Sequence, residues 1–287
     1  MLGAADIAGK AVMPAITTSG NGRLVAIASR DPERARAVAS QHSIARVAAG
    51  YEDLLEDGEV DAVYIPLVNS LHKEWTLRAI AAGKHVLCEK PLGMDAAEAE
   101  DMGAAAKGKG VHLMEAFMYR FHPRMAEFVE GVRDPLHVQA SFGFTLADKG
   151  NYRFNKAFGG GALLDVGCYT VSVARWILGE PDDVLAHARV DGVDMTVSAL
   201  LQFPGGATAS LFASFESAEE QELKVVARDS THRMKLPFTW RDSHNSYQLM
   251  VESFGESVLH DRPVAISLDE SVANMKVLDR IRVAAKI

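Results

Sequence analysis

The sequence predicts an α/β domain with a doubly wound parallel sheet, followed by an α+β domain with a mostly antiparallel sheet. Over the first 120 residues, short apolar runs alternate with amphipathic helical stretches, which is typical of βαβ units. After Pro123 the pattern changes to a helix, several alternating strand-like runs and two closing helices. We therefore place a domain boundary near Arg120 and expect domains of residues 1–119 and 120–287.

Four apolar runs and four helical stretches define the first domain. The predicted strands are residues 24–28, 60–65, 85–88 and 111–114, and the predicted helices are residues 32–42, 51–56, 71–82 and 95–107. Asp31 and Asp95 are well placed to cap two of these helices, because their side-chain oxygens can accept hydrogen bonds from N–H groups of the first turn.

The second domain begins with a helix after Pro123. Its predicted strands are residues 137–142, 195–203, 207–215 and 223–226, and its further helices are residues 162–178, 247–259 and 268–284. The run Pro204-Gly205-Gly206 is expected to form a hairpin turn between two of these strands.

Composition limits the kind of partner. The chain has 287 residues, a formal net charge of -8 and two cysteines, Cys88 and Cys168. The charge and the lack of Lys/Arg-rich runs argue against a nucleic-acid or membrane surface. No run reaches the roughly 18 to 20 apolar residues that span a bilayer, and Asp6 and Lys10 interrupt the apolar N-terminus, so we expect no anchor or signal peptide. Two cysteines fit neither a disulfide framework nor a zinc cluster, so a reducing cytoplasm is expected.

A small-residue turn lies at the N-terminus. Gly3-Ala4-Ala5-Asp6-Ile7-Ala8 is a degraded G-x-G-x-x-G/A, a turn that can present N–H groups to a pyrophosphate, although alone such a string is more often a chance turn. Only Met1 and Leu2 precede it, whereas the first strand of such a sheet needs about five residues. The first strand is thus apparently truncated. Either the true start lies upstream, which we expect, or the chain is a fragment, or the fold tolerates a stub.

The run Ser29-Arg30-Asp31 ends the strand predicted at 24–28, and Arg34 follows one helical turn later. At this position an acidic residue suits the adenosine ribose of NAD, whereas Arg suits the 2′-phosphate of NADP. A hydroxyl with guanidinium groups therefore favours NADP over NAD. The alternative is that Arg30 and Arg34 are solvated surface charges, for which Glu33 is an available partner.

Lys90 follows the predicted strand 85–88, in the run Cys88-Glu89-Lys90-Pro91. This places it at the carboxyl end of the parallel sheet, where open α/β folds bind ligands. Its ammonium group can donate to a substrate hydroxyl and favours the ionised form of a neighbouring acid. The alternative is an ordinary surface lysine.

Asp165 and Tyr169 follow the run Gly159-Gly160-Gly161. They lie four apart on the predicted helix 162–178, so they share a face and can address one bound molecule, and the glycines allow backbone and ligand to approach closely. Because a nearby ammonium group lowers a tyrosine pKa, Lys90 and Tyr169 form a candidate acid–base pair for alcohol oxidation. The alternative for Tyr169 is a packed side chain whose hydroxyl is satisfied by Asp165.

Four runs, in order along the chain, resemble the glucose–fructose oxidoreductase/inositol dehydrogenase (Gfo/Idh/MocA) family. They are Asn69 through His72, Gly83 through Leu92, Glu115 through Pro123 and Gly159 through Tyr169. The resemblance implies a Rossmann-like first domain and a second domain whose sheet carries the substrate face and often an oligomer interface. Tyrosine at 169, where many members have histidine, looks like the trans-dihydrodiol dehydrogenase, D-xylose dehydrogenase and glucose–fructose oxidoreductase branch.

The resemblance also implies roles for single residues. Lys90 would be the catalytic lysine, Tyr169 the acid–base residue and Asp165 a carboxylate that orients the substrate. From the patterns above or from the resemblance, the residues expected to bind the cofactor are Gly3, Ala4, Ala5, Asp6, Ile7, Ser29, Arg30, Arg34, Leu67, Asn69, His72, Glu89, Lys90 and Glu115. Those expected to bind the substrate are Lys90, Tyr152, Arg153, Asp165 and Tyr169. The alternatives are a structural bond for His72 and a surface charge for Arg153.

The expected protein is an NAD(P)-dependent oxidoreductase that needs no metal. It would transfer hydride reversibly between a sugar or vicinal-diol hydroxyl and the nicotinamide of NADP or NAD, as a cytoplasmic homodimer or homotetramer. Two alternatives remain: a glycosidase that works by transient oxidation with bound NAD, and an impaired nucleotide-binding or sensing protein or fragment.

Overall fold

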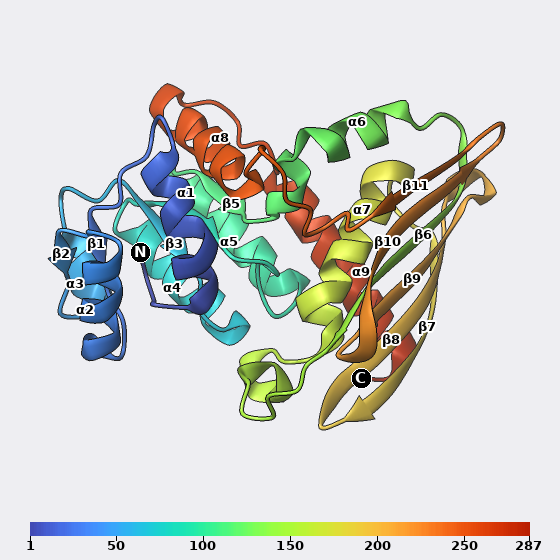
Figure 1. The fold of residues 1–287 in the computed structure, drawn as a ribbon, viewed down its shortest axis with the longest axis horizontal. Coiled ribbons are helices and arrows are strands. Elements are labelled where there is room, and N and C mark those ends of the chain that lie inside the picture. The colour runs from blue at the N-terminus through green and yellow to red at the C-terminus, as the bar shows by residue number, and fades with distance from the viewer. The chain divides into compact units, whose positions relative to one another are not determined.

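The computed structural model describes residues 1–287, which form two compact units (Figure 1). The first unit comprises residues 1–93, 97–121 and 243–271, and the second comprises residues 94–96, 122–242 and 272–287. The expected cut near Arg120 lies beside the main crossing at residues 121 and 122. The sequence did not reveal that the chain returns to the first unit at residue 243, so a single cut at 119/120 does not describe the division.

A parallel sheet forms the centre of the first unit. Its strands are β1 (Ala26–Ile27), β2 (Arg46–Val47), β3 (Ala62–Ile65), β4 (His85–Cys88) and β5 (Leu113–Glu115). β1 pairs with β2, and β4 pairs with β3 and β5, all in parallel. The prediction missed only the edge strand β2, whose Arg-Val pair is too short to give a pattern.

The N-terminal residues lie between β1 and β3. Leu2 forms a parallel bridge with Ala28, and its N–H group donates to the carbonyl of Tyr64 at 3.0 Å. The Met1 ammonium donates to Ala26 O at 3.0 Å, and burial lowers the pKa of this amine to about 5. Met1 to Gly3 therefore take the central position of the sheet, where the strand order reverses.

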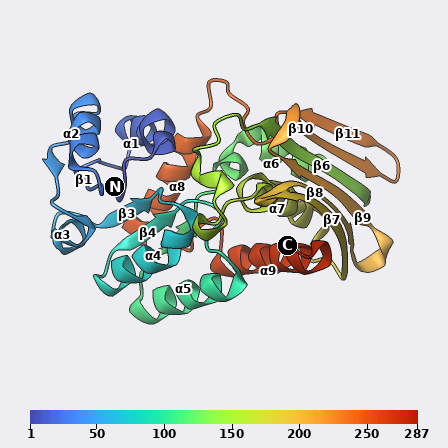
Figure 2. The same cartoon turned by 90° about the horizontal axis from the view of Figure 1, so that it is seen from below.

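Helices cover both faces of this sheet. They are η1 (Ala8–Val12), α1 (Met13–Thr18), α2 (Pro32–Gln41), α3 (Tyr51–Glu56), η2 (Asn69–Leu71), α4 (His72–Ala81), α5 (Ala96–Lys109), η3 (Met118–Phe121) and α8 (Ser246–His260). In Figure 2, α1 and α2 lie on one side of β3 and β4, whereas α4 and α5 lie on the other. Asp31 caps α2 as predicted, since its side chain accepts from the N–H groups of Glu33 and Arg34.

A six-stranded sheet forms the second unit, in the order β11-β10-β6-β9-β8-β7. The strands are β6 (Pro135–Thr145), β7 (Asp183–Asp191), β8 (Val193–Gln202), β9 (Thr208–Ser214), β10 (Glu216–Ala227) and β11 (Thr231–Lys235). All neighbours are antiparallel except β6 and β9, which confirms the mostly antiparallel prediction. The hairpin between β8 and β9 turns through η7 (Pro204–Gly206), where Gly205 and Gly206 have positive φ angles.

The second unit also contains helices, of which η6 and α7 contact the sheet. The helices of this unit are α6 (Pro123–Gly131), η4 (Tyr152–Phe154), η5 (Lys156–Phe158), η6 (Leu163–Gly167), α7 (Cys168–Leu178) and α9 (Leu268–Ala285). The run Lys156–Leu178 is long and apolar enough by composition to cross a bilayer, but 83% of its apolar window is buried inside the protein. A core helix passes the same test, and α7 contacts β6 and β9.

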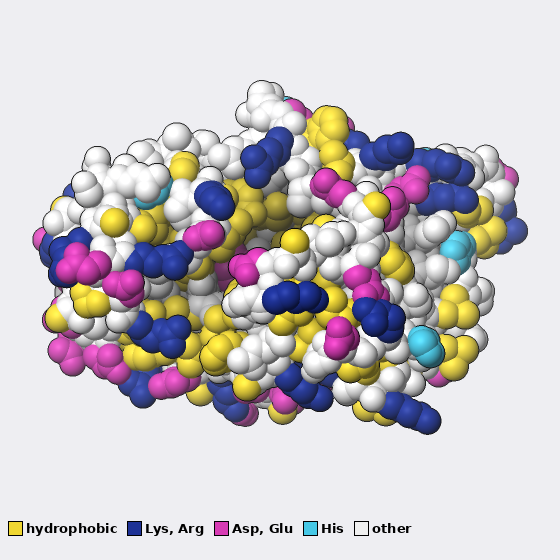
Figure 3. Space-filling model, turned by 60° about the horizontal axis from the view of Figure 1, so that its bottom comes forward, with side chains coloured by type: hydrophobic (Ala, Val, Ile, Leu, Met, Phe, Trp, Pro, Cys, Tyr) yellow, Lys and Arg dark blue, Asp and Glu magenta, His cyan; other side chains and the backbone are white.

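One face of the protein carries charges of both signs. On the face drawn in Figure 3, Lys and Arg side chains are interspersed with Asp and Glu. The whole chain has 30 basic and 38 acidic residues.

Candidate active site

The turn predicted to meet the cofactor pyrophosphate begins at Gly3, where the N-terminal residues leave the sheet. Gly3 donates its N–H group to Ala28 O at 2.8 Å and has a φ angle of 115°, which glycine adopts without strain. A Cβ atom at this position would lie 2.9 Å from Cδ2 of Leu67. The chain then enters the helical run of η1 and α1. A bare backbone turn before a helix N-terminus fits a pyrophosphate, which binds N–H groups at close range.

The end of β1 carries the residues predicted to meet the adenosine. The Ser29 hydroxyl accepts the N–H group of Asp31 at 3.2 Å, and the Asp31 carboxylate is engaged in capping α2. Arg34 donates from Nη2 to Oδ1 of Asp6 at 2.8 Å, which joins the start of α2 to the turn that begins at Gly3. Glu33 pairs with Arg36 instead, so the alternative pairing of Arg34 with Glu33 is wrong.

His72 joins the segments that follow β3 and β4. Its Nε2 lies 2.9 Å from Leu67 O and its Nδ1 lies 2.9 Å from Pro91 O, next to Lys90. The ring is fully buried. The pKa of His72 is lowered, chiefly by burial and also by the Lys90 charge. The two carbonyl contacts raise this pKa, but by less. A neutral ring carries one N–H group, so it donates to one of these two carbonyls and lies against the other, between the loops at Leu67 and Lys90.

Tyr64 and Glu89 form a buried pair beside Lys90. The parallel register places Tyr64 opposite Leu87, so the Tyr64 and Glu89 side chains point to the same face of the sheet. The Tyr64 hydroxyl donates to Oε1 of Glu89, whose Oε2 accepts the N–H group of Lys90 at 3.3 Å. Burial and then the Glu89 charge raise the pKa of Tyr64 well above its usual value, so its hydroxyl stays a donor.

Asn69 and Glu115 complete this end of the sheet. Asn69 opens η2 with a buried side chain, and Glu115 ends β5 at 1% exposure. Oε1 of Glu115 accepts the N–H group of Leu92 at 2.9 Å. The carboxyl ends of β3, β4 and β5 thus bring together the predicted residues Leu67, Asn69, His72, Glu89, Lys90 and Glu115.

Asp165 and Arg153 form the polar centre of the second unit. Asp165 lies in the π-helical turn η6 directly before α7, and its Oδ2 accepts a hydrogen bond from Nε of Arg153 at 2.7 Å. Burial lowers the pKa of Arg153, but the charge of Asp165 and the neighbouring Tyr152 and Tyr169 raise it, and the net direction is upward. Arg153 is therefore an anchored cation rather than an ordinary surface charge.

The glycine run lets this polar centre pack closely. Gly161 donates to Arg153 O at 3.0 Å, and a Cβ atom on Gly160 would lie 2.4 Å from the same oxygen. A Cβ atom on Gly161 would lie 1.9 Å from Oδ1 of Asp194, whose Oδ2 accepts the N–H group of Leu163 at 2.7 Å. These glycines therefore bring the Arg153 segment and Asp194 against the turn that carries Asp165.

Tyr169 lies in the first turn of α7 and is 8% exposed. Its ring packs against Phe142 of β6 and Phe238, with ring centroids 5.4 and 5.5 Å away. Nearby, the Arg153 guanidinium lies 5.1 Å from the centre of the Tyr152 ring. The second unit thus gathers all its predicted substrate residues: Tyr152, Arg153, Asp165 and Tyr169.

Sequence reasoning missed Tyr64, Phe142, Phe238 and Asp194. Only Tyr64 left a signal, since a tyrosine one residue before the end of a buried strand needs a partner for its hydroxyl. The others meet the site through long-range pairing of strands and loops, which one sequence does not show.

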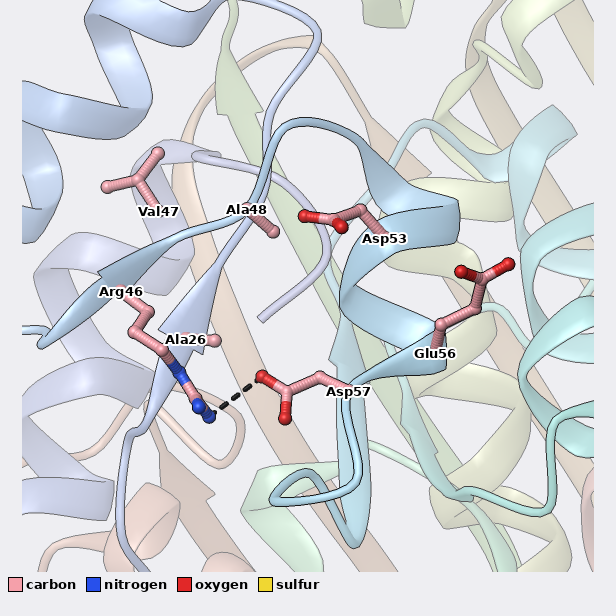
Figure 4. A pocket seen from close by; sticks show the side chains of 7 residues that line it. All are labelled: Ala26, Arg46, Val47, Ala48, Asp53, Glu56 and Asp57. Carbon is pink, nitrogen blue, oxygen red and sulfur yellow. Dashed lines mark ion pairs between the residues drawn. The ribbon is translucent and has the colours of Figure 1, made fainter.

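A recess of about 400 Å³ lies between β1, β2 and α3. Its lining includes Arg46, Asp53, Glu56 and Asp57, and none of the predicted site residues (Figure 4). Arg46 is paired with Asp57 at 2.7 Å and with Glu59 at 2.6 Å. Since Arg46 is already paired and no predicted site residue lines this recess, we do not count it as part of the candidate site.

Comparisons with known proteins agree with this arrangement. Residues 1–117 match a family described as oxidoreductases with an NAD-binding Rossmann fold, and residues 133–232 match the GFO/IDH/MocA C-terminal domain. A D-xylose 1-dehydrogenase (NADP(+)) from Haloferax volcanii is 38% identical over 100% of this chain and 96% of its own length. A trans-1,2-dihydrobenzene-1,2-diol dehydrogenase from Mus musculus is 42% identical over 68% of this chain and 61% of its own.

Solved structures show the same fold. An aldose-aldose oxidoreductase from Caulobacter crescentus, complexed with glycerol, has a TM-score of 0.93 and 28% identity, with 99% of this chain and 96% of that one covered. A 3-ketoreductase from Actinomadura kijaniata, in complex with NADP and TDP-benzene, has a TM-score of 0.86 and 30% identity over the same shares. This chain therefore belongs to the GFO/IDH/MocA family of NAD(P)-dependent oxidoreductases.

Proposed function

We propose that this enzyme transfers hydride reversibly between the carbinol carbon of a sugar or vicinal diol and NADP, with Tyr169 as the acid–base residue and Lys90 as its partner. The observation that carries the proposal is the cluster of Leu67, His72, Glu89 and Lys90 at the carboxyl ends of β3 and β4, where ligands of open α/β sheets bind. The relatives named for D-xylose and for a dihydrodiol support the substrate class.

The first unit would hold the cofactor and position Lys90. Bound NAD(P) supplies the hydride acceptor at its nicotinamide. The Gly3 turn would face the pyrophosphate, and Ser29, Arg30 and Arg34 the adenosine end. The Glu89 carboxylate accepts hydrogen bonds from the Lys90 N–H group and the Tyr64 hydroxyl. These bonds fix the backbone at Lys90, from which its side chain would reach the reacting oxygen.

The second unit would supply the proton acceptor and orient the substrate. Tyr169 takes the hydroxyl proton as the carbinol carbon is oxidised and returns it in the reverse direction. Asp165 accepts a hydrogen bond from a second substrate hydroxyl, and Arg153 holds that carboxylate in place. In the substrate complex, the Lys90 ammonium would donate a hydrogen bond to the substrate oxygen that Tyr169 deprotonates. This hydrogen bond would favour the anionic form of that oxygen.

The roles of Lys90 and Tyr169 are tested by turnover of single variants. Lys90→Ala and Tyr169→Phe are expected to lower kcat by at least about a hundredfold, because general acid–base groups contribute on that order. Matched controls are Lys107→Ala, which removes an exposed lysine from α5, and Thr170→Val, which removes a buried hydroxyl beside Tyr169. Full turnover in either site variant would refute its role. A release of free sugar without net cofactor reduction would instead indicate a glycosidase.

A homodimer or homotetramer is part of the proposal. Leu185 of β7 and Leu200 of β8 are direct cross-strand partners, and their side chains are 64% and 45% exposed. Such an apolar pair on an open sheet face favours burial against a second copy. Light scattering is expected to report a dimer or tetramer, and Leu185→Glu with Leu200→Glu is expected to yield monomers. We place the enzyme in the reducing cytoplasm, since Cys88 and Cys168 are buried free thiols.

A further inference from the structure

Asp6 is an acidic residue within the turn that would face the cofactor phosphates. Its carboxylate, 74% exposed, accepts a hydrogen bond from Nη2 of Arg34 at 2.8 Å, and its other oxygen lies 3.6 Å from Nζ of Lys10. The Asp31 carboxylate is occupied by the N–H groups of α2. Asp6 is therefore the carboxylate that competes for the guanidinium proposed to meet a 2′-phosphate.

The two cofactors respond differently to this competition. A 2′-phosphate binds a guanidinium through paired charge-assisted hydrogen bonds, so NADP has to draw Arg34 away from Asp6. NAD carries a neutral 2′-hydroxyl at this position, so its binding does not require Arg34 to leave Asp6. The Asp6 charge also repels a dianionic phosphate more than it repels a hydroxyl. Since both side chains are about half exposed or more, the ion pair is weak enough for a phosphate to displace.

We propose that Asp6 sets the cofactor selectivity of this enzyme, lowering its preference for NADP over NAD by holding Arg34. The proposal rests on the proposed function, in which the Gly3 turn and the start of α2 bind the cofactor. It assigns Asp6 a specificity role through Arg34 and gives it no part in hydride or proton transfer.

The test is a double-mutant cycle read by calorimetric titration of NADP and NAD. Asp6→Asn is expected to tighten NADP binding by about fivefold, which corresponds to an exposed ion pair of about 1 kcal/mol, and to change NAD binding by less than about twofold. In an Arg34→Gln background the same change is expected to have no such effect on NADP. Asp101→Asn is the matched control, because it also removes a carboxylate from an ion pair between two helices. Asp101 of α5 pairs with Lys73 of α4 at 2.7 Å.

Three results overturn the proposal. They are weaker NADP binding in Asp6→Asn, an equal gain for both nucleotides, and an unchanged gain in the Arg34→Gln background. Each of these outcomes leaves the proposed function intact, because the wild-type protein still binds the cofactor. A wild-type protein that binds neither nucleotide overturns the proposed function, and the role of Asp6 falls with it.

Discussion

Nε of Arg153 donates to Oδ2 of Asp165 at 2.7 Å, which links the segment of Tyr152 to the turn that precedes Tyr169. The Asp165 side chain is 9% exposed and that of Arg153 is 30% exposed, so this ion pair lies mostly inside the second unit. It fixes the geometry of the part of this unit that carries the residues proposed to bind the substrate.

Replacing Arg153 with methionine should therefore destabilise the protein and impair substrate binding. We expect the free energy of unfolding to fall by about 2 kcal/mol, because the change removes the guanidinium from a buried carboxylate. The KM for the substrate should rise while cofactor affinity stays constant. Arg189→Met is the control, since Arg189 pairs with Glu216 on the exposed sheet and its loss should cost less than about 1 kcal/mol. Equal losses of stability in both variants would contradict the assignment.

Gly3→Ala should weaken cofactor binding. The φ angle of 115° and the contact at 2.9 Å with Leu67 leave no room for a Cβ atom, so the turn has to shift. We expect the dissociation constant for NADP to rise more than about tenfold, with about 1–3 kcal/mol lost in stability. Gly83→Ala is the control, because Gly83 has a φ angle of 77° with open space around it. That variant should lose stability but keep its nucleotide affinity.

Because of His72, the free energy of unfolding should decrease as the pH falls below 6.5. Its folded-state pKa is below the usual 6.5, chiefly through burial, so the unfolded chain binds the proton more readily. The contribution is fully present above pH 6.5 and is lost as the pH falls towards the folded-state pKa. Denaturant unfolding at several pH values should show a shallower decline in His72→Gln than in the wild type. A His72→Gln slope equal to that of the wild type would contradict the account.

Tyr64→Phe should impair the reaction through Glu89. The change removes one donor from a buried carboxylate, which disfavours its ionised form. We expect kcat/KM to fall by about tenfold and the acidic limb of its pH profile to move to higher pH. Thr76→Val is the matched control, since Thr76 is a buried hydroxyl that meets Cys88 and not Glu89. A pH profile that stays in place would show that Tyr64 has only a packing role.

Periodicity predicted most elements of the first unit, because its βαβ contacts are close in sequence. The strand at 85–88 and the helix at 51–56 were predicted with the bounds that the structure has. The strands β7 and β11 were missed because both lie at sheet edges and most of their residues are exposed, which leaves few buried apolar positions to give a pattern. The crossing back to the first unit at residue 243 depends on long-range packing of α8, which no local pattern encodes.

The sequence predicted the candidate-site residues that lie in recognisable motifs. It did not predict the contacts that arise from tertiary packing. The runs around Lys90 and Tyr169 predicted the two residues that we propose for the acid–base chemistry. The sequence did not predict that His72 uses both ring nitrogens on backbone carbonyls, or that Asp6 pairs with Arg34. These contacts join residues from separate elements, so they follow from the fold and not from spacing.

The most direct test of the central claim is the near-ultraviolet absorbance of reduced nicotinamide, followed with NADP and a panel of aldoses, ketoses and trans-dihydrodiols. We expect NADP reduction with at least one aldose or dihydrodiol, lost in Tyr169→Phe. Binding of NADP with no reduction by any member of the panel would contradict the claim that this chain oxidises a sugar or diol hydroxyl.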